Sequence, residues 1–147
     1  MSISQPLGIF PLYNLESLTE SLRAEGLPHA DLYEPEREFF QLQQGDQLVG
    51  YVGIEGATAD RLVRSFLVFR SHRREGIGSE ALALLELLLV SRGVETLHLL
   101  TTTAAPFFQH HGFKIRARTT APSAIQHTLE FRNLCPASAN YMAKRIT

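Results

Sequence analysis

The chain has 147 residues, of which 44% are hydrophobic and 20% are charged, and its formal net charge is −1. This composition predicts one folded domain over residues 1–147 and argues against a general nucleic-acid surface. The only cysteine, Cys135, excludes an intrachain disulfide and a cysteine-built metal site, so we expect no metal. The first residues lack the charged start and long apolar run of a signal peptide, and no apolar run is long enough to span a bilayer, which predicts a cytoplasmic protein without a membrane partner.

The first 36 residues predict a strand, a helix and an irregular connection. Residues 7–13 are typical of a strand, and Asn14 can cap a helix over residues 14–25 that carries leucines at helical spacing. A turn at Gly26-Leu27-Pro28 ends that helix. Residues 29–35 form a connection rich in carboxylates, and we expect Asp31 to be solvated there.

The middle of the chain predicts a mixed sheet. Residues 39–43 and 48–54 flank a Gly-Asp turn and form a hairpin, and residues 62–69 form the next strand of an antiparallel meander. A leucine-rich helix then leads to a parallel strand at residues 96–101. A short helix over residues 104–111, a strand from Phe113 and a last strand over residues 139–146 complete an α/β fold whose sheet is mostly antiparallel, with six to seven strands and flanking helices.

A basic, glycine-containing loop joins the third meander strand to the leucine-rich helix. Gly76 and Gly78 permit close backbone approach, and Ser79 lies in the first helical turn. Such a helix start presents unpaired N–H groups and the positive end of the helix dipole, which favours a phosphate or pyrophosphate. Five arginines crowd this region and make its positive charge local: Arg61, Arg64, Arg70, Arg73 and Arg74.

A dinucleotide site is the alternative for the same loop. Residues 76–81 match G-x-G-x-x-A, and Glu95 follows at about the spacing of a ribose-binding acid. However, residues 69–75 separate the strand from the first glycine, and Glu95 falls at the start of the next strand. Both features disfavour a Rossmann loop.

The loop and a second motif together resemble a known enzyme family. The loop motif is Val68-x-Arg70-x-x-Arg73-Arg74-x-Gly76-Ile77-Gly78, and the second motif is Ala104-x-x-Phe107-Phe108-x-x-x-Gly112-Phe113. With these motifs, the chain from Gly50 onward resembles the Gcn5-related N-acetyltransferase (GNAT) superfamily. The segments TTTA, FF and GF, followed by Glu130-Phe131 and Leu134-Cys135-Pro136, are similar to the small acetyltransferases associated with arsenic-resistance operons.

The resemblance implies direct transfer of acetyl from acetyl-CoA, as co-substrate, to the amine of a small molecule in a ternary complex. Backbone groups of Phe66 and Val68 would pair with the pantetheine arm where two strands diverge, and a backbone N–H near Val68 would polarise the thioester carbonyl. The pyrophosphate would lie on residues 73–79. The resemblance therefore assigns cofactor binding to Phe66, Leu67, Val68, Arg73, Arg74, Glu75, Gly76, Ile77, Gly78, Ser79 and Phe108.

The catalytic residues are less well defined. Glu55, at the end of a strand beside the cofactor strand, is the candidate general base, and His98 is the second candidate. Many family members have a tyrosine in place of Phe108 that protonates the departing thiolate, so Thr103 or Tyr141 would have to replace that hydroxyl. The acceptor would be an amino-acid-like compound or an organoarsenical toxin.

Several further assignments complete the set of expectations. Arg64 and Arg118 could bind a carboxylate of the acceptor. We expect His110 and His111 to be surface histidines and Cys135 to be a packing residue. An edge strand near the C-terminus could support a homodimer. Because phenylalanine replaces the tyrosine, a noncatalytic acyl-CoA-binding or sensing module is the alternative function.

Overall fold

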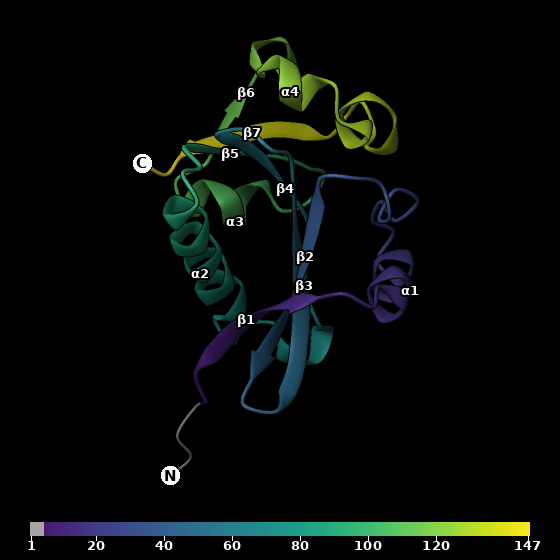
Figure 1. Ribbon diagram of the computed structural model, residues 1–147, viewed down its shortest axis with the longest axis vertical. Coiled ribbons are helices and arrows are strands. Elements are labelled where there is room, and N and C mark those ends of the chain that lie inside the picture. The colour runs from purple at the N-terminus through teal and green to yellow at the C-terminus, as the bar shows by residue number, and fades with distance from the viewer. Residues whose placement is uncertain (1–4) are drawn as a thin grey trace.

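A computed structural model describes residues 5–147 of the chain, apart from the side chains of residues 133 and 134. Its centre is a seven-stranded sheet in the order β1-β2-β3-β4-β5-β7-β6 (Figure 1). The strands are β1 (Leu7–Leu12), β2 (Arg37–Gln44), β3 (Gln47–Glu55), β4 (Asp60–Val68), β5 (Thr96–Thr101), β6 (Lys114–Arg116) and β7 (Asn140–Arg145). Neighbouring strands are antiparallel except for β4 and β5. The predicted mixed, mostly antiparallel sheet is therefore confirmed.

Short and long helices connect these strands. They are α1 (Glu16–Ala24), α2 (Ile77–Ser91), α3 (Ala105–His110) and α4 (Ser123–Gln126), with single turns η1 (Arg70–His72), η2 (Arg118–Thr120) and η3 (Glu130–Leu134). Within residues 5–147, none of the helices has the length and apolar character needed to cross a membrane.

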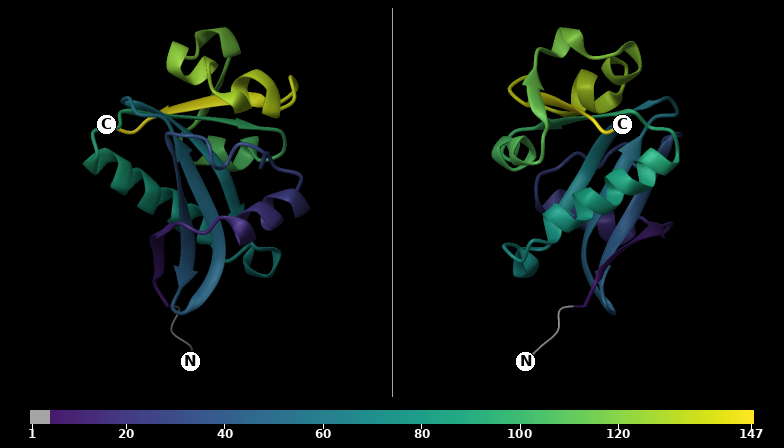
Figure 2. Two further views of the ribbon diagram at one scale, coloured as in Figure 1. Left: turned by 45° about the vertical axis from the view of Figure 1, so that its right-hand side comes forward. Right: turned by 90° about the vertical axis from the view of Figure 1, so that its left-hand side faces the viewer.

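The helices cover both faces of the sheet, as the two views of Figure 2 show. Successive side chains of a strand point to opposite faces. Accordingly, Phe40 packs into the cluster formed with α2, whereas its neighbour Phe39 packs into the cluster formed with α1. A third cluster joins Leu62 of β4 to Ile125 of α4 and Tyr141 of β7.

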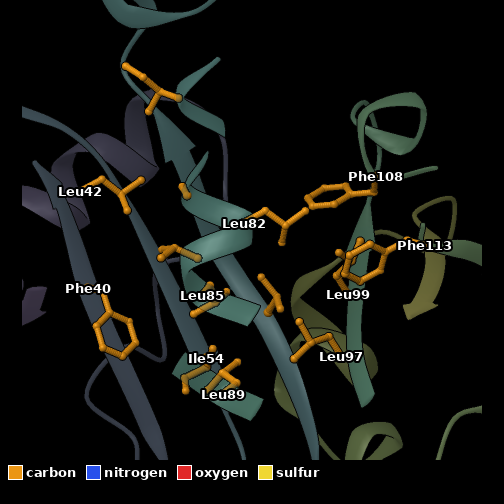
Figure 3. Close-up of a cluster of buried hydrophobic side chains, with 14 of the residues drawn as sticks. Phe40, Leu42, Ile54, Leu82, Leu85, Leu89, Leu97, Leu99, Phe108 and Phe113 are labelled. Carbon is orange, nitrogen blue, oxygen red and sulfur yellow. The ribbon is translucent and has the colours of Figure 1, made fainter. Parts of the chain in front are cut away.

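The largest core lies between the sheet and α2. Leu82, Leu85 and Leu89 repeat at helical spacing and are almost completely buried against strand residues such as Ile54 and Leu97 (Figure 3). Burying each such side chain contributes about 1.5–3 kcal/mol. This helix is therefore fixed firmly to the sheet, and its N-terminus has a defined position.

Strands β4 and β5 diverge along their length. Their pairing runs from Asp60↔Thr96 to Leu62↔His98, and no later pair joins them in the described part of the chain. An irregularity in the pairing of β3 with β4 follows between Tyr51 and Gly53, and Ser65 takes a left-handed φ of 55°. In Figure 1, β4 runs vertically while β5 runs across the upper part of the molecule, below α4. The carboxyl-terminal half of β4 thus has no strand partner on its β5 side.

Two details differ from the expectations. Helix α2 begins at Ile77, inside the glycine loop, because Gly76 takes a φ of 78° and serves as its N-cap. The last strand, β7, lies inside the sheet between β5 and β6. The exposed edge near the C-terminus is instead the three-residue strand β6.

Candidate active site

The glycine loop, residues 73–79, lies directly at the N-terminus of α2. Both Arg74 and Gly76 have left-handed φ values, of 68° and 78°, which turn the chain into the helix. A Cβ at Gly78 would lie 3.3 Å from the Phe107 ring of α3, so the helix start and α3 are in close contact. The first-turn N–H groups of a 15-residue helix have no intrahelical partners. The loop can therefore receive an anionic group.

Fewer arginines reach this loop than the sequence suggested. Arg70 and Arg73 pair with Glu25, at 3.1 and 3.3 Å, and the hydrogen bond from Arg70 is the main cause that lowers the pKa of Glu25. Arg73 also donates from Nε to the Val68 carbonyl at 3.0 Å, while Arg74 is exposed. The expected crowding by Arg61 and Arg64 is wrong, because Arg61 donates to the Thr58 carbonyl just before β4 and Arg64 is enclosed by three carboxylates.

Aromatic side chains fill the space beside the diverging strands. The Phe66 ring lies 6.0 Å from that of Phe108 and 6.2 Å from that of Phe107, both in edge-to-face geometry. Phe108 also contacts Phe113 and is only 7% exposed. The position that carries tyrosine in many relatives of the resembled family is therefore an apolar packing site in this chain.

His111 is not a simple surface histidine. Its Nε2 lies 2.9 Å from the Ser79 hydroxyl in the first turn of α2, and its ring lies 4.7 Å from that of Phe107. The adjacent His110 is exposed, as expected. His111 thus fixes the side chain of Ser79, one of the residues expected to hold the cofactor.

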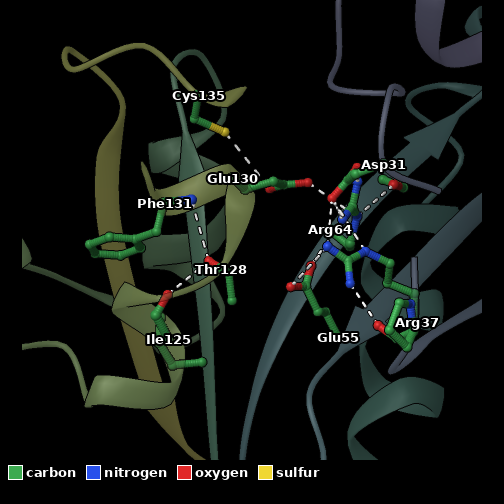
Figure 4. A network of polar contacts seen from close by, with 11 residues as sticks. Asp31, Arg37, Glu55, Arg64, Ile125, Thr128, Glu130, Phe131 and Cys135 are labelled. Carbon is green, nitrogen blue, oxygen red and sulfur yellow. Dashed lines mark hydrogen bonds and ion pairs between the residues drawn. The ribbon is translucent and has the colours of Figure 1, made fainter. Parts of the chain in front are cut away.

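A buried network, which we call the arginine network, lies on the opposite face of β4 (Figure 4). Its members are Asp31, Arg37, Glu55, Arg64 and Glu130. The Arg64 side chain is 0% exposed and pairs with Asp31 at 2.6 Å, Glu55 at 2.9 Å and Glu130 at 3.1 Å. Arg37 pairs with Asp31 at 2.9 Å and Glu55 at 3.4 Å. Three carboxylates thus surround two guanidinium groups.

Burial and the ion pairs of this network shift the pKa values of two of its carboxyl groups and of the neighbouring Cys135. Burial raises the pKa of Glu130 to about 7 in spite of Arg64. Burial also opposes ionisation of Asp31, but hydrogen bonds from Arg64 and Arg37 outweigh it and hold its pKa below the ordinary value. Beside Glu130, burial raises the pKa of Cys135 to about 12, so this thiol is unreactive at neutral pH and behaves as the expected packing residue.

The network changes three expectations. Asp31 is 4% exposed, so its assignment to a solvated loop is wrong. Arg64 is enclosed by carboxylates and does not present its guanidinium to a substrate. Both oxygens of Glu55 are held by arginines, a geometry that does not favour its expected role as a base. One signal in the sequence was available: an arginine within an apolar strand needs buried partners, although their identity depends on the fold.

The remaining candidates lie around the carboxyl end of β5. Thr103 is exposed between β5 and α3. Arg118 donates from Nη2 to the carbonyls of Pro136 and Ala139, at 2.8 and 2.9 Å, so this nitrogen ties η2 to the start of β7.

Two cavities open on the face of the sheet that carries the arginine network. The first, of about 300 Å³, is lined by residues that include Asp60, His98 and Tyr141. The second, of about 250 Å³, is lined by residues that include Glu55, Asp60 and Thr128. Within the described residues, no group of His, Cys, Asp and Glu side chains is arranged to hold a metal ion.

Comparison with known proteins identifies the family. A sequence profile described as "Acetyltransferase (GNAT) domain" matches residues 35–115, and no curated protein matches the chain. Tetrahymena Gcn5 has a similar structure, with a TM-score of 0.76 and 14% identity over 95% of this chain and 96% of its own. An aminoglycoside 6'-N-acetyltransferase complexed with coenzyme A has a TM-score of 0.70 and 20% identity over 97% and 98% of the two chains.

A larger enzyme contains the same fold. N-acetylglutamate synthase from Neisseria gonorrhoeae, complexed with coenzyme A and N-acetyl-glutamate, has a TM-score of 0.76 and 15% identity. The match covers 97% of this chain but only 35% of the synthase. The profile match, the diverging strands β4 and β5 and the glycine loop at the start of α2 lead to one conclusion: the chain belongs to the GNAT family of acetyl-CoA-dependent acetyltransferases.

Proposed function

We propose that the chain transfers an acetyl group from acetyl-CoA to the primary amine of a small molecule. The observation that carries the proposal is the unpaired side of β4 beyond Leu62, which ends at the glycine loop. A pantetheine arm can pair with backbone groups of Phe66 and Val68 along this side. Its pyrophosphate then meets the start of α2, where N–H groups and the helix dipole stabilise negative charge.

The reaction requires a neutral amine that attacks the thioester carbonyl and a thiolate that leaves. An α-amino group has a reference pKa of about 7.7–8.0, so a modest base suffices near neutral pH. The backbone N–H near Val68 is our proposed donor to the developing oxyanion. We propose that Thr103, exposed at the carboxyl end of β5, supplies a hydroxyl to the thiolate in place of the missing tyrosine.

The proposed acceptor is an amino-acid-like compound, and an organoarsenical of this kind belongs among the test substrates. Support comes from the sequence resemblance to acetyltransferases of arsenic-resistance operons. Arg118 remains our candidate for binding an acceptor carboxylate. We do not propose Arg64, because its side chain is 0% exposed and paired with three carboxylates.

Acetyl-CoA-dependent release of free thiol tests this function directly. The acceptors to compare are L-glutamate, L-methionine, spermidine and an amino-acid-like organoarsenical, each with the protein and with a protein-free control. We expect thiol release to require both the protein and one of the amines, and the product to carry an N-acetyl group by mass spectrometry. Tight acetyl-CoA binding without amine-dependent release by any acceptor would contradict the proposal.

Phe108 favours a second candidate, a noncatalytic acyl-CoA-binding module. The ring is buried among aromatic residues and offers no proton to a thiolate. A Phe108→Tyr variant separates the candidates. If the parent is an enzyme, it turns over without the added hydroxyl. If only the tyrosine variant turns over, the natural chain is a binding module.

A further inference from the structure

Three polar side chains form a continuous hydrogen-bonded chain on β4, β5 and β7. Asp60 Oδ1 lies 2.7 Å from His98 Nε2, and His98 Nδ1 lies 2.7 Å from the Tyr141 hydroxyl. His98 and Tyr141 are 3% and 2% exposed, and their rings stack with an interplanar angle of 5°. We call this set the histidine chain.

The histidine chain has a direction within the fold. Tyr141 pairs with Leu100, near the carboxyl end of β5, where that strand has already diverged from β4. Asp60 pairs with Thr96 at the other end of β5. At about 3.3 Å per strand residue, these two levels of β5 are about 13 Å apart. The Tyr141 hydroxyl itself lies beside His98, which forms the last β4–β5 pair with Leu62, so the histidine chain begins where the strands start to diverge and ends at Asp60, whose side chain is one-third exposed.

The donor and acceptor roles follow from Asp60. An ionised carboxylate only accepts hydrogen bonds, so His98 donates from Nε2. In a neutral imidazole, Nδ1 is then an acceptor, and the Tyr141 hydroxyl donates to it. This order of donors allows a proton to move from Tyr141 through His98 to Asp60. Burial also raises the pKa of Tyr141, which keeps the phenol protonated at neutral pH.

We propose that Asp60, His98 and Tyr141 form a relay that removes the acceptor's proton during acetyl transfer. The inference rests on the proposed function and assigns the base that Glu55 does not supply. The neutral amine nitrogen bonds to the acetyl carbon, the carbon–sulfur bond breaks and the departing thiolate takes the excess nitrogen proton. Before this attack, the ammonium form of the acceptor gives one proton to the Tyr141 oxygen as the tyrosine proton moves to His98 Nδ1. The Nε2 proton shifts to Asp60 and then to water.

The surroundings of the histidine chain are cationic. Arg116 of β6 and Lys144 and Arg145 of β7 line the same cavity of about 300 Å³. Lys144 pairs with Glu86 at 2.9 Å, and Arg145 donates to the carbonyl of Thr147. The cavity side of the histidine chain therefore carries these cations beside the Asp60 carboxylate.

The pH dependence of kcat with the best acceptor of the panel tests the relay. We expect Tyr141→Phe and His98→Gln to lower kcat at pH 7 by about 10²-fold, the lower range for a positioned acid or base. The loss should shrink as pH rises toward the pKa of the free amine, because the amine then loses its proton to solvent. An unchanged pH profile in both variants would overturn the proposal.

Tyr51→Phe is the matched control. Tyr51 is also buried, at 1% exposure, and its hydroxyl lies 2.8 Å from that of Ser17 on α1. Tyr51→Phe and Tyr141→Phe each remove one buried hydroxyl contact, so similar decreases in the melting temperature are expected. Only Tyr141→Phe should change the pH profile. An equal change of the pH profile in both variants would show that Tyr141 has only a structural role and would overturn the relay.

The tautomer of His98 gives a readout that needs no acceptor. Nitrogen-15 spectra of the imidazole at about pH 8 should show protonated Nε2 and unprotonated Nδ1. A proton on Nδ1 at pH 8 would overturn the relay even if the protein is an active acetyltransferase. Conversely, the expected tautomer in a protein that acetylates nothing would reject the proposed function and leave the donor order of the histidine chain established.

Discussion

Glu130 is the carboxyl group of the arginine network whose pKa is raised in the folded protein. Its pKa is raised from 4.5 to about 7 by burial. A carboxyl group whose pKa rises on folding stabilises the folded state below its unfolded pKa, and this contribution is lost as pH increases through the folded value. The raised pKa corresponds to roughly 3 kcal/mol between pH 4.5 and pH 7.

We therefore predict that Glu130→Gln removes a pH-dependent loss of stability. The variant keeps two carboxylates, Asp31 and Glu55, with two guanidiniums, so the buried charges balance. Urea unfolding at pH 5, 6, 7 and 8 should show that the free energy of unfolding of the parent falls more steeply than that of the variant. Parallel curves over this range would contradict the raised pKa of Glu130.

Asp31→Asn is the informative contrast within the same network. Its pKa is lowered by Arg64 and Arg37, so its contribution to stability is present above the unfolded pKa of 3.8 and lost as pH falls. Removing this carboxylate at pH 7 leaves two buried arginines short of a partner and should cost roughly 3–5 kcal/mol. Equal unfolding midpoints for Asp31→Asn and the parent at pH 7 would show that the network does not depend on this ion pair.

Arg64→Met tests the centre of the network. The substitution leaves Asp31, Glu55 and Glu130 around an uncharged side chain, and we predict a loss of roughly 3–5 kcal/mol at pH 7. Without Arg64 the pKa of Glu130 rises further, so its carboxyl is neutral at pH 7 in Arg64→Met, and adding Glu130→Gln should change the stability by a different amount from the same substitution in the parent. Denaturant unfolding of the single and double variants measures the coupling. Strict additivity would contradict direct pairing of Arg64 with Glu130.

At the scale of elements, α2 joins the core to the cofactor loop. The predicted function of this helix depends on the left-handed Gly76 at its start. Gly93, just beyond its end, has a similar φ of 81°, and a Cβ at either glycine would meet no atom within 4 Å. The two positions therefore differ in location and not in backbone strain or crowding.

We predict that Gly76→Ala and Gly93→Ala destabilise the protein by similar amounts, about 1–2 kcal/mol, because alanine resists a left-handed φ. Only Gly76→Ala should weaken acetyl-CoA binding, since it disturbs the loop that faces the pyrophosphate. Melting temperatures and acetyl-CoA titrations of both variants check this. Equal affinity in Gly76→Ala and Gly93→Ala would place the pyrophosphate elsewhere.

The elements were largely predictable from the sequence, whereas the contacts between them were not. The apolar run of β4, the two glycines and the leucine spacing of α2 are local signals, and they predicted the order of strand, loop and helix correctly. The burial of Asp31 depends on its contact with Arg64, which lies 33 positions further along the chain, and no local pattern records that contact. The contact of His111 with Ser79 depends in the same way on α3 lying beside the start of α2.

At the scale of the whole molecule, the sheet consists of two parts. Strands β1–β4 form a continuous antiparallel unit, and among residues 5–147 the strand pairing that joins β5–β7 to it is the short parallel one at the start of β4. The family profile covers residues 35–115, and the segment after it supplies α4, η3 and β7. This segment contributes both Glu130 and Tyr141, so we propose that residues 5–147 act as one domain.

The central claim is that acetyl-CoA binds along the unpaired side of β4. Thermal unfolding with acetyl-CoA, and separately with NAD, tests it most directly. A ligand present at 100 times its dissociation constant stabilises by about 2.7 kcal/mol, which raises the melting temperature by roughly 5–10 °C at about 2–4 °C per kcal/mol. We predict this rise with acetyl-CoA and none with NAD. A rise with NAD alone would contradict the claim and favour a dinucleotide site at the glycine loop.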